Sequence, residues 1–130
     1  MARVKAFKGL RPPVEIAADL ASRPYDVMNS QEARIEAKGN EFSLLHVTKA
    51  EISLPEGIDE HSKEVYDKVV ENFQMFKDKK WLVKDSEPKL YIYAQTMDER
   101  TQYGIVGCTH IDDYFNNIIL KHELTRKDKE

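Results

Sequence analysis

The clearest periodic pattern along the chain lies between Asp59 and Lys80, where apolar and polar positions repeat as they do in a helix. The apolar positions follow one another at spacings of four, four and three residues: Val65, Val69, Phe73 and Phe76. Side chains at these spacings share one face of an α-helix, and polar residues occupy the opposite face. The pattern therefore predicts the longest helix of the chain at about residues 60–80, with Trp81 packed against its end.

A second pattern, with a period of two, begins after Pro88. Residues 90–96 and 102–111 are rich in tyrosine, isoleucine, valine and threonine, and the polar segment 98–101 separates them. Aromatic and β-branched residues on both sides of a short polar turn are typical of a β-hairpin. We therefore predict an antiparallel hairpin over about residues 90–111.

Shorter elements are predicted elsewhere in the chain. Strands are expected at residues 4–7 and 43–49, the second because its apolar positions alternate around His46. Short helices are expected after Pro13, from an N-cap at Ser30 to Lys38, and after a cap at Asp112 or Asp113. Because this order does not consist of βαβ repeats, it predicts an α+β fold, with a mixed or antiparallel sheet and packed helices.

Length and composition are those of an ordinary globular domain. The 130 residues are 41% hydrophobic and 33% charged, so residues 1–130 are expected to form a single domain with its own core. Cys108 is the one cysteine, which excludes an internal disulfide and favours a cytoplasmic location. No run of about 18 apolar residues occurs, so no contact with a membrane is expected.

The charge of the chain argues against nucleic acid as a partner. The net charge is −3, whereas binding to a phosphate backbone requires clustered lysine and arginine. One cluster of cations precedes the first acidic residue, and a solvated basic edge is its simplest explanation: Arg3, Lys5, Lys8 and Arg11. No helix-turn-helix pattern is present either.

The candidate chemistry lies in the last ten residues. Adjacent His122 and Glu123 follow an apolar run, and Thr125, Arg126 and Lys127 come directly after them. A carboxylate can take a proton from a hydroxyl group, and cations and a hydroxyl can hold anionic phosphate oxygens. This segment therefore indicates phosphate chemistry, with His122 and Glu123 as catalytic candidates and the other three residues as phosphate contacts. A solvated surface pair is the alternative for His122 and Glu123.

Asp26 has two interpretations. In the sequence Pro24-Tyr25-Asp26-Val27 the proline fixes one dihedral angle, and the aspartate can close a turn by hydrogen bonding to the backbone. These structural roles are sufficient to explain both residues. Alternatively, Asp26 binds the substrate or Mg²⁺, which prefers hard oxygen donors. No metal site is predicted from the histidines, because their spacing follows no zinc pattern.

Several segments of the chain match a known family. They are Phe7-Lys8-Gly9-Leu10-Arg11-Pro12, Pro24-Tyr25-Asp26-Val27, Asn40 with residues 43–48, residues 88–96, residues 104–108 and residues 121–130. Together they resemble the N-terminal part of the bacterial and archaeal family called domain of unknown function 1015, whose members carry ParB-like or SpoOJ-like labels. Family members are considerably longer, so the resemblance implies that this chain is an N-terminal fragment of a longer protein.

The resemblance also implies a reaction. The family is distantly similar to ParB/sulfiredoxin-like proteins, among them nucleotide-dependent free serine kinases, in which a glutamate beside a histidine activates the serine hydroxyl. Some members are linked to serine biosynthesis as replacements for phosphoserine phosphatase. His122 and Glu123 would correspond to the kinase pair, with serine or phosphoserine as substrate, and ADP or ATP and Mg²⁺ as cofactors of the full-length protein. The second phosphate-binding motif is expected beyond Glu130, so the fragment alone is expected to be inactive and to bind no cofactor.

Two other functions remain open from the sequence. The ParB-like label suggests a nucleic-acid-associated module, against which the net charge argues. The second alternative is a purely structural N-terminal domain, which supports chemistry located elsewhere in a longer protein. The direction of the reaction, the nucleotide and the oligomeric state are not determined by these residues.

Overall fold

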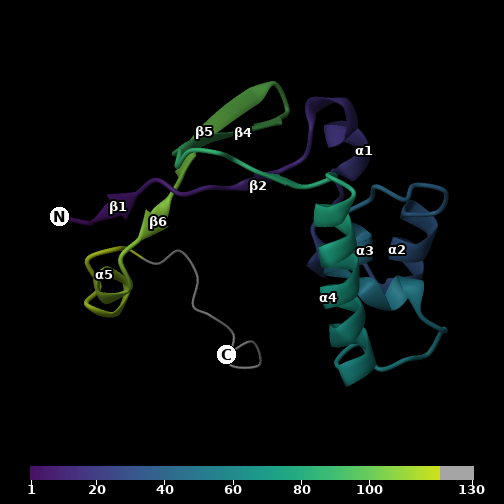
Figure 1. Cartoon of the computed structure of the whole chain (residues 1–130). Coiled ribbons are helices and arrows are strands. Elements are labelled where there is room, and N and C mark those ends of the chain that lie inside the picture. The colour runs from purple at the N-terminus through teal and green to yellow at the C-terminus, as the bar shows by residue number, and fades with distance from the viewer. Residues whose placement is uncertain (121–130) are drawn as a thin grey trace. The chain divides into compact units, whose positions relative to one another are not determined.

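The computed structural model describes residues 1–120 (Figure 1). These residues belong to two compact units, of which the first comprises residues 1–9 with the described part of 85–130 and the second comprises Leu10–Lys84. Helices and antiparallel strand pairs occur together, which confirms the predicted α+β class. A single domain over residues 1–130 stays a prediction.

The Leu10–Lys84 unit is mainly helical and contains one strand pair. Its elements are β2 (Leu10–Arg11), η1 (Val14–Ile16), α1 (Ala17–Leu20), η2 (Tyr25–Val27), α2 (Ser30–Glu36), α3 (Leu45–Thr48), η3 (Ala50–Ser53), α4 (Lys63–Asp78) and β3 (Val83–Lys84), where η denotes a 3-10 helix. The strands β2 and β3 are antiparallel and pair Leu10 with Lys84.

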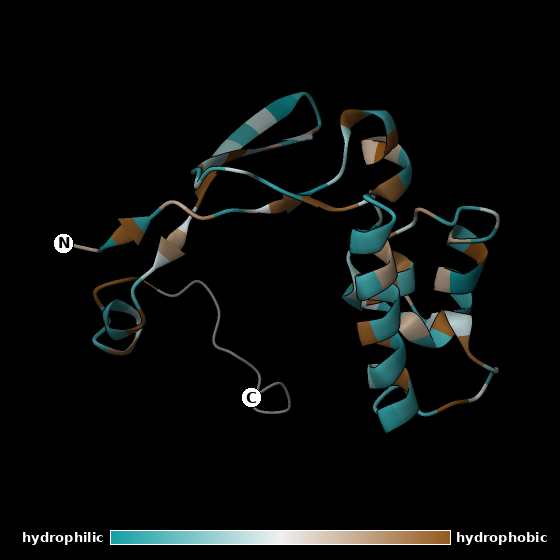
Figure 2. Cartoon of the chain, in the orientation of Figure 1, coloured by the Kyte–Doolittle hydropathy of each residue, from teal (hydrophilic) through white to brown (hydrophobic). Residues whose placement is uncertain are grey.

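Helix α4 confirms the predicted long helix. It begins after Ser62, whose hydroxyl oxygen accepts a hydrogen bond from the backbone N–H of Val65 at 3.4 Å. Val65 and Phe76 on the predicted apolar face are buried, and Phe73 packs against the same cluster as Phe76. As predicted, Trp81 follows the helix and lies edge-on to Phe76, with 5.0 Å between ring centroids. Figure 2 shows the hydrophobic positions of α4 set among hydrophilic ones.

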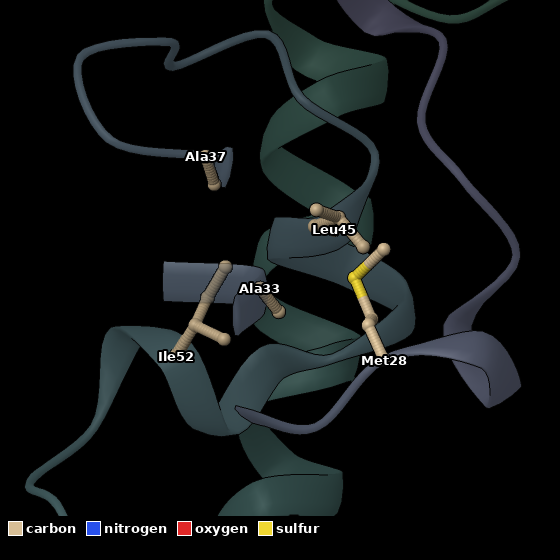
Figure 3. Packing of buried hydrophobic residues seen from close by; sticks show 5 residues of the cluster. All are labelled: Met28, Ala33, Ala37, Leu45 and Ile52. Atoms are coloured by element: carbon tan, nitrogen blue, oxygen red, sulfur yellow. The ribbon is translucent and has the colours of Figure 1, made fainter. Parts of the chain in front are cut away.

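The core of this unit consists of two clusters of buried side chains. One joins α1 to α4 through Leu20, Phe76 and Leu82. The other joins α2 to α3 and η3 and is shown in Figure 3: Met28, Ala33, Ala37, Leu45 and Ile52. Ala33 on α2 and Ala37, the C-cap of this helix, are four residues apart, and their small side chains let the helix approach its neighbours closely.

The predicted strand over residues 43–49 is wrong, because Leu45–Thr48 form helix α3. The carbonyl of Leu44 accepts hydrogen bonds from the backbone N–H groups of Val47 and Thr48 at 2.9 and 3.0 Å. Apolar residues at 44, 45 and 47 fit a helical face as well as an alternating strand, and seven residues are too few to separate the two periods. Burial of Leu45 against α2 favours the helix.

The predicted N-cap of α2 is also displaced by one residue. Asn29, and not Ser30, is the cap: its Oδ1 accepts from the backbone N–H of Glu32 at 2.9 Å. The carboxylate of Glu32 accepts in return from the backbone N–H of Asn29 at 2.8 Å, which completes a capping box. The hydroxyl of Ser30 is therefore available for contacts outside the helix.

The first unit is built from strand pairs and one short helix. Its elements are β1 (Val4–Lys5), β4 (Tyr91–Met97), β5 (Arg100–Val106), β6 (Cys108–Thr109) and α5 (Ile111–Phe115). β4 and β5 form the predicted antiparallel hairpin, in register from Tyr91 opposite Val106 to Met97 opposite Arg100. β1 pairs with β6. The first predicted strand, residues 4–7, is thus confirmed over Val4–Lys5.

The base of the hairpin is joined to the N-terminal segment through Tyr91. Its hydroxyl accepts from the backbone N–H of Gly9 at 2.7 Å and donates to Oδ2 of Asp85 at 2.6 Å. A Cβ atom at Gly9 would lie 2.7 Å from the same hydroxyl, so any larger residue there would have to displace the ring of Tyr91. Farther along the hairpin, Tyr93 and Tyr103 are exposed among the described residues.

Asp113 links the N-terminal strand to α5. Its carboxylate is 1% exposed and accepts from the backbone N–H of Arg3 at 2.7 Å and from Nη2 of Arg3 at 2.6 Å. These hydrogen bonds lower the pKa of Asp113 from its usual value to about 2. The predicted cap of α5 at Asp112 or Asp113 is wrong, because Nδ1 of His110 caps the helix by accepting from the backbone N–H of Asp112.

Acid should abolish the stabilising effect of the Asp113 contact. The pKa of Asp113 is lower in the folded state than in the unfolded state, where an aspartate titrates at about 3.9. The contact therefore makes its full contribution to stability well above that value, and this contribution is lost as the pH falls towards 2. The NMR shift of the Arg3 amide proton should therefore titrate with a midpoint near 2. Asp113→Asn should abolish that titration, whereas Asp112→Asn should preserve it. A wild-type midpoint near 4 would contradict this assignment.

Phe76→Ala should destabilise the Leu10–Lys84 unit by about 3–5 kcal/mol, because it removes a completely buried ring and leaves a cavity. Urea unfolding followed by the fluorescence of Trp81 measures this change. The matched control is Val70→Ala on the same helix, where the side chain is 69% exposed and a change within about 0.5 kcal/mol is expected. Equal effects of the two substitutions would contradict the assigned core.

Candidate functional site

Most of the predicted site residues fall outside the part of the chain that the structure describes. These are His122, Glu123, Thr125, Arg126 and Lys127, and their roles stay predictions.

Asp26 is described, and it lies in η2 with an exposed side chain. Within residues 1–120, no group of three or more histidine, cysteine, aspartate or glutamate side chains could hold a metal ion. The role of Asp26 as a ligand of the substrate or of Mg²⁺ stays a prediction.

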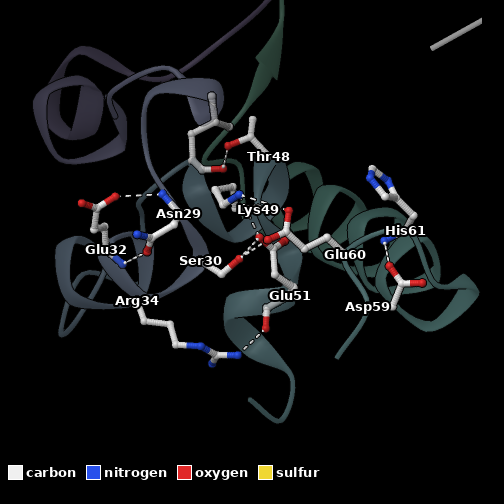
Figure 4. Close-up of polar contacts among 11 residues, drawn as sticks. Asn29, Ser30, Glu32, Arg34, Thr48, Lys49, Glu51, Asp59, Glu60 and His61 are labelled. Atoms are coloured by element: carbon white, nitrogen blue, oxygen red, sulfur yellow. Dashed lines mark hydrogen bonds and ion pairs between the residues drawn. The ribbon is translucent and has the colours of Figure 1, made fainter. Parts of the chain in front are cut away.

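The structure instead brings together four polar residues of the Leu10–Lys84 unit, here called the Ser30 cluster: Ser30, Lys49, Glu51 and Glu60 (Figure 4). Nζ of Lys49 lies 3.1 Å from Oε1 of Glu51 and 3.7 Å from Oε2 of Glu60. Oγ of Ser30 lies 2.9 Å from Oε1 of Glu51 and 2.7 Å from Oε1 of Glu60. The side chains of Lys49 and Glu51 are 8% and 6% exposed, whereas that of Glu60 is 52% exposed.

Local structure explains why these side chains meet. The capping box at Asn29 places Ser30 at the start of α2, and Arg34 lies one turn later on the same face. The guanidinium of Arg34 donates to the backbone carbonyls of Glu51 and Leu54, each at 2.7 Å, and to the carbonyl of Ile52. Arg34 thereby holds η3 against α2 and brings Glu51 to the hydroxyl of Ser30.

The Ser30 cluster combines one hydroxyl, one ammonium group and two carboxylates. A serine hydroxyl has one proton and can donate it to only one acceptor at a time, yet Ser30 lies within hydrogen-bonding distance of two carboxylates. Lys49 offsets the charge of buried Glu51, and exposed Glu60 connects the group to solvent. The hydroxyl of Ser30 thus cross-links the two carboxylates, donating to one of them at a time.

A cavity of about 250 Å³ opens beside this cluster, and Ser30, Arg34, Glu51, Glu56 and Gly57 are among the residues that line it. It is smaller than the sites of drug-sized ligands, which have volumes of about 300–1,000 Å³. Because carboxylate and hydroxyl oxygens contribute to its wall, the cavity suits a small polar molecule that carries an amino or hydroxyl group.

Comparison with known proteins assigns the chain to a family. The chain belongs to the family described as protein of unknown function (DUF1015), which matches residues 4–130. The match confirms the family resemblance and includes residues of both units. Neither the curated proteins nor the solved structures contain a match. The similarity to ParB-like proteins and to free serine kinases stays an expectation.

The structure also bears on the membrane prediction. Among residues 1–120, none of the helices combines the length and the apolar character needed to cross a membrane. The cytoplasmic location inferred from the single cysteine stays a prediction.

Lys49→Met should destabilise the Leu10–Lys84 unit by about 3–5 kcal/mol, because it leaves the buried carboxylate of Glu51 without its cation. Adding Glu51→Gln should restore much of the loss, since the unpaired charge is then removed. Chemical unfolding followed by circular dichroism compares these variants. The control is Lys63→Met, which breaks an exposed pair with Asp67 and should cost about 0.5 kcal/mol or less. A double variant less stable than Lys49→Met would contradict the explanation.

Proposed function

We propose that the protein takes part in nucleotide-dependent phosphoryl transfer to or from serine, either as a free serine kinase-like phosphotransferase or in the reverse reaction that consumes phosphoserine. The observation that carries the proposal is the sequence of residues 121–127, in which a histidine–glutamate pair precedes a threonine and two cations. Support also comes from the family resemblance, which relates this pair to the one that activates serine in free serine kinases.

The proposed reaction assigns one role to each residue type. In the forward direction the serine hydroxyl oxygen forms a bond to the transferred phosphorus, and the bond from phosphorus to the nucleotide oxygen breaks. Glu123 takes the hydroxyl proton and returns it in the reverse direction. His122, Thr125 and Arg126, together with Lys127, contact the phosphate oxygens.

Binding to nucleic acid is not part of this proposal. The chain has a net charge of −3, and Arg3, one of the four cations near the N-terminus, is bound to Asp113. This pairing reduces the positive field available to a phosphate backbone.

Glu123→Gln should lower phosphoryl transfer to or from serine by about 10²–10⁴-fold, because glutamine keeps the size of glutamate but cannot accept the proton. The assay follows phosphoserine and serine by mass spectrometry, with ATP or ADP and Mg²⁺, in the full-length protein. Arg126→Ala should mainly raise the concentration of nucleotide or phosphoserine needed for half-maximal rate.

The matched control is Glu87→Gln, a change of the same chemistry at an exposed position, which should leave the rate unchanged. Full activity of Glu123→Gln would refute the catalytic assignment. An absence of serine or phosphoserine turnover in the wild-type protein with either nucleotide would refute the proposed function.

A further inference from the structure

We propose that a second cavity of the Leu10–Lys84 unit is a binding site for a small organic anion, either a phosphate monoester or a carboxylate. The cavity has a volume of about 230 Å³, and the residues that line it include His46, Ser53, Lys68, Lys79 and Trp81. None of these residues has a role in the proposed phosphoryl transfer, so the two proposals can fail independently.

The first argument is the hydrogen bonding of His46. Its Nε2 lies 3.0 Å from the backbone carbonyl oxygen of Asn40, and because a carbonyl only accepts, Nε2 carries a hydrogen. In the neutral ring Nδ1 is then an acceptor, and Oγ of Ser53 lies 3.4 Å from it. The ring is oriented by the backbone, and it directs Nδ1 to a serine hydroxyl on the cavity wall.

The second argument is the charge of the lining. The charged side chains of the lining are those of Lys68, Lys79 and Glu41. Nζ of Lys68 lies 2.9 Å from Oε1 of Glu71, and Nζ of Lys79 lies 3.6 Å from Oε2 of Glu41. Each ammonium has three N–H donors, more than one such contact requires. Each lysine is thus paired with one glutamate, and the N–H donors that these contacts leave over favour a ligand with anionic acceptor oxygens.

The third argument is the apolar part of the wall. Met75 and Trp81 also line the cavity, and Nζ of Lys79 lies 4.3 Å from the centroid of a Trp81 ring. An anionic group next to Lys79 would therefore place the rest of its molecule near the indole. This arrangement favours an organic anion with a compact apolar body over a free inorganic ion.

The neighbouring cavity provides a contrast within the same unit. The 3-10 helix η3 contributes Glu51 to the cavity beside the Ser30 cluster and Ser53 to this one. Two carboxylates and the guanidinium of Arg34 line the first cavity, whereas two ammonium groups and one carboxylate line this one. The two sites are thus suited to ligands of opposite character.

Trp81 makes a direct test possible, because it is the one tryptophan of the chain and lines the cavity. Its fluorescence should change saturably when the chain is titrated with phenyl phosphate or with benzoate at constant ionic strength. Tighter binding of phenyl phosphate identifies a phosphate monoester site, and tighter binding of benzoate a carboxylate site. Inorganic phosphate should bind at least about tenfold more weakly than the better of the two, since it lacks a group for the apolar wall.

Lys68→Gln should weaken binding about tenfold, because it removes a cation from the cavity wall. Lys63→Gln, an exposed position five residues earlier on the same helix, should leave the affinity unchanged. Lys79→Gln, which removes the ammonium beside Trp81, should also weaken binding and keeps the test decisive if Lys68→Gln fails to fold. The proposal is overturned if neither organic anion gives a saturable change, if inorganic phosphate binds as tightly, or if Lys63→Gln weakens binding as much as Lys68→Gln.

Discussion

The buried ion pair between Lys49 and Glu51 is the constraint on which the two cavities of the helical unit depend. Both charges are almost fully removed from water, so neither tolerates the loss of the other, and the turn from Lys49 into η3 is restricted to the conformation in which they meet. Arg34 adds a second restraint by binding three backbone carbonyls at the same turn. Because η3 supplies a side chain to each cavity, a displacement of this turn would alter both sites.

The sequence predicts the structure of a long periodic segment of this fold more reliably than that of a short one. Helix α4 has 16 residues, which is enough for its apolar spacing to be unambiguous, and the two arms of the hairpin are identified by a shared alternation around a polar turn. Residues 43–49 gave the wrong period because burial of Leu45 decides their structure, and burial is a tertiary effect. The caps Asn29 and His110 were missed in favour of neighbouring residues that are equally able to cap a helix.

Functional residues are harder to predict when they meet only through the fold. The segment after Lys121 attracts attention because its reactive side chains are consecutive, although the structure does not describe it. Ser30, Lys49, Glu51 and Glu60 are distributed over more than one element, and the one local signal is two opposite charges within the largely apolar stretch 44–54. His46 is hydrogen-bonded through Nε2 to the backbone carbonyl of Asn40. Its contact with Ser53 depends on the helical turn that the sequence pattern did not predict.

The exposure of the hairpin determines which part of the protein unfolds locally. β4 and β5 pair only with each other among the described residues, and their facing residues Ile92 and Ile105 are 77% and 76% exposed. Such a two-stranded ribbon gains little from apolar burial, so its tip resists separation mainly through its own backbone hydrogen bonds. The base is different, because Tyr91 fastens it to the N-terminal segment. The ribbon is therefore a unit of local unfolding whose amide protons exchange with solvent progressively faster from Tyr91 towards the turn at Asp98, without loss of the helical core.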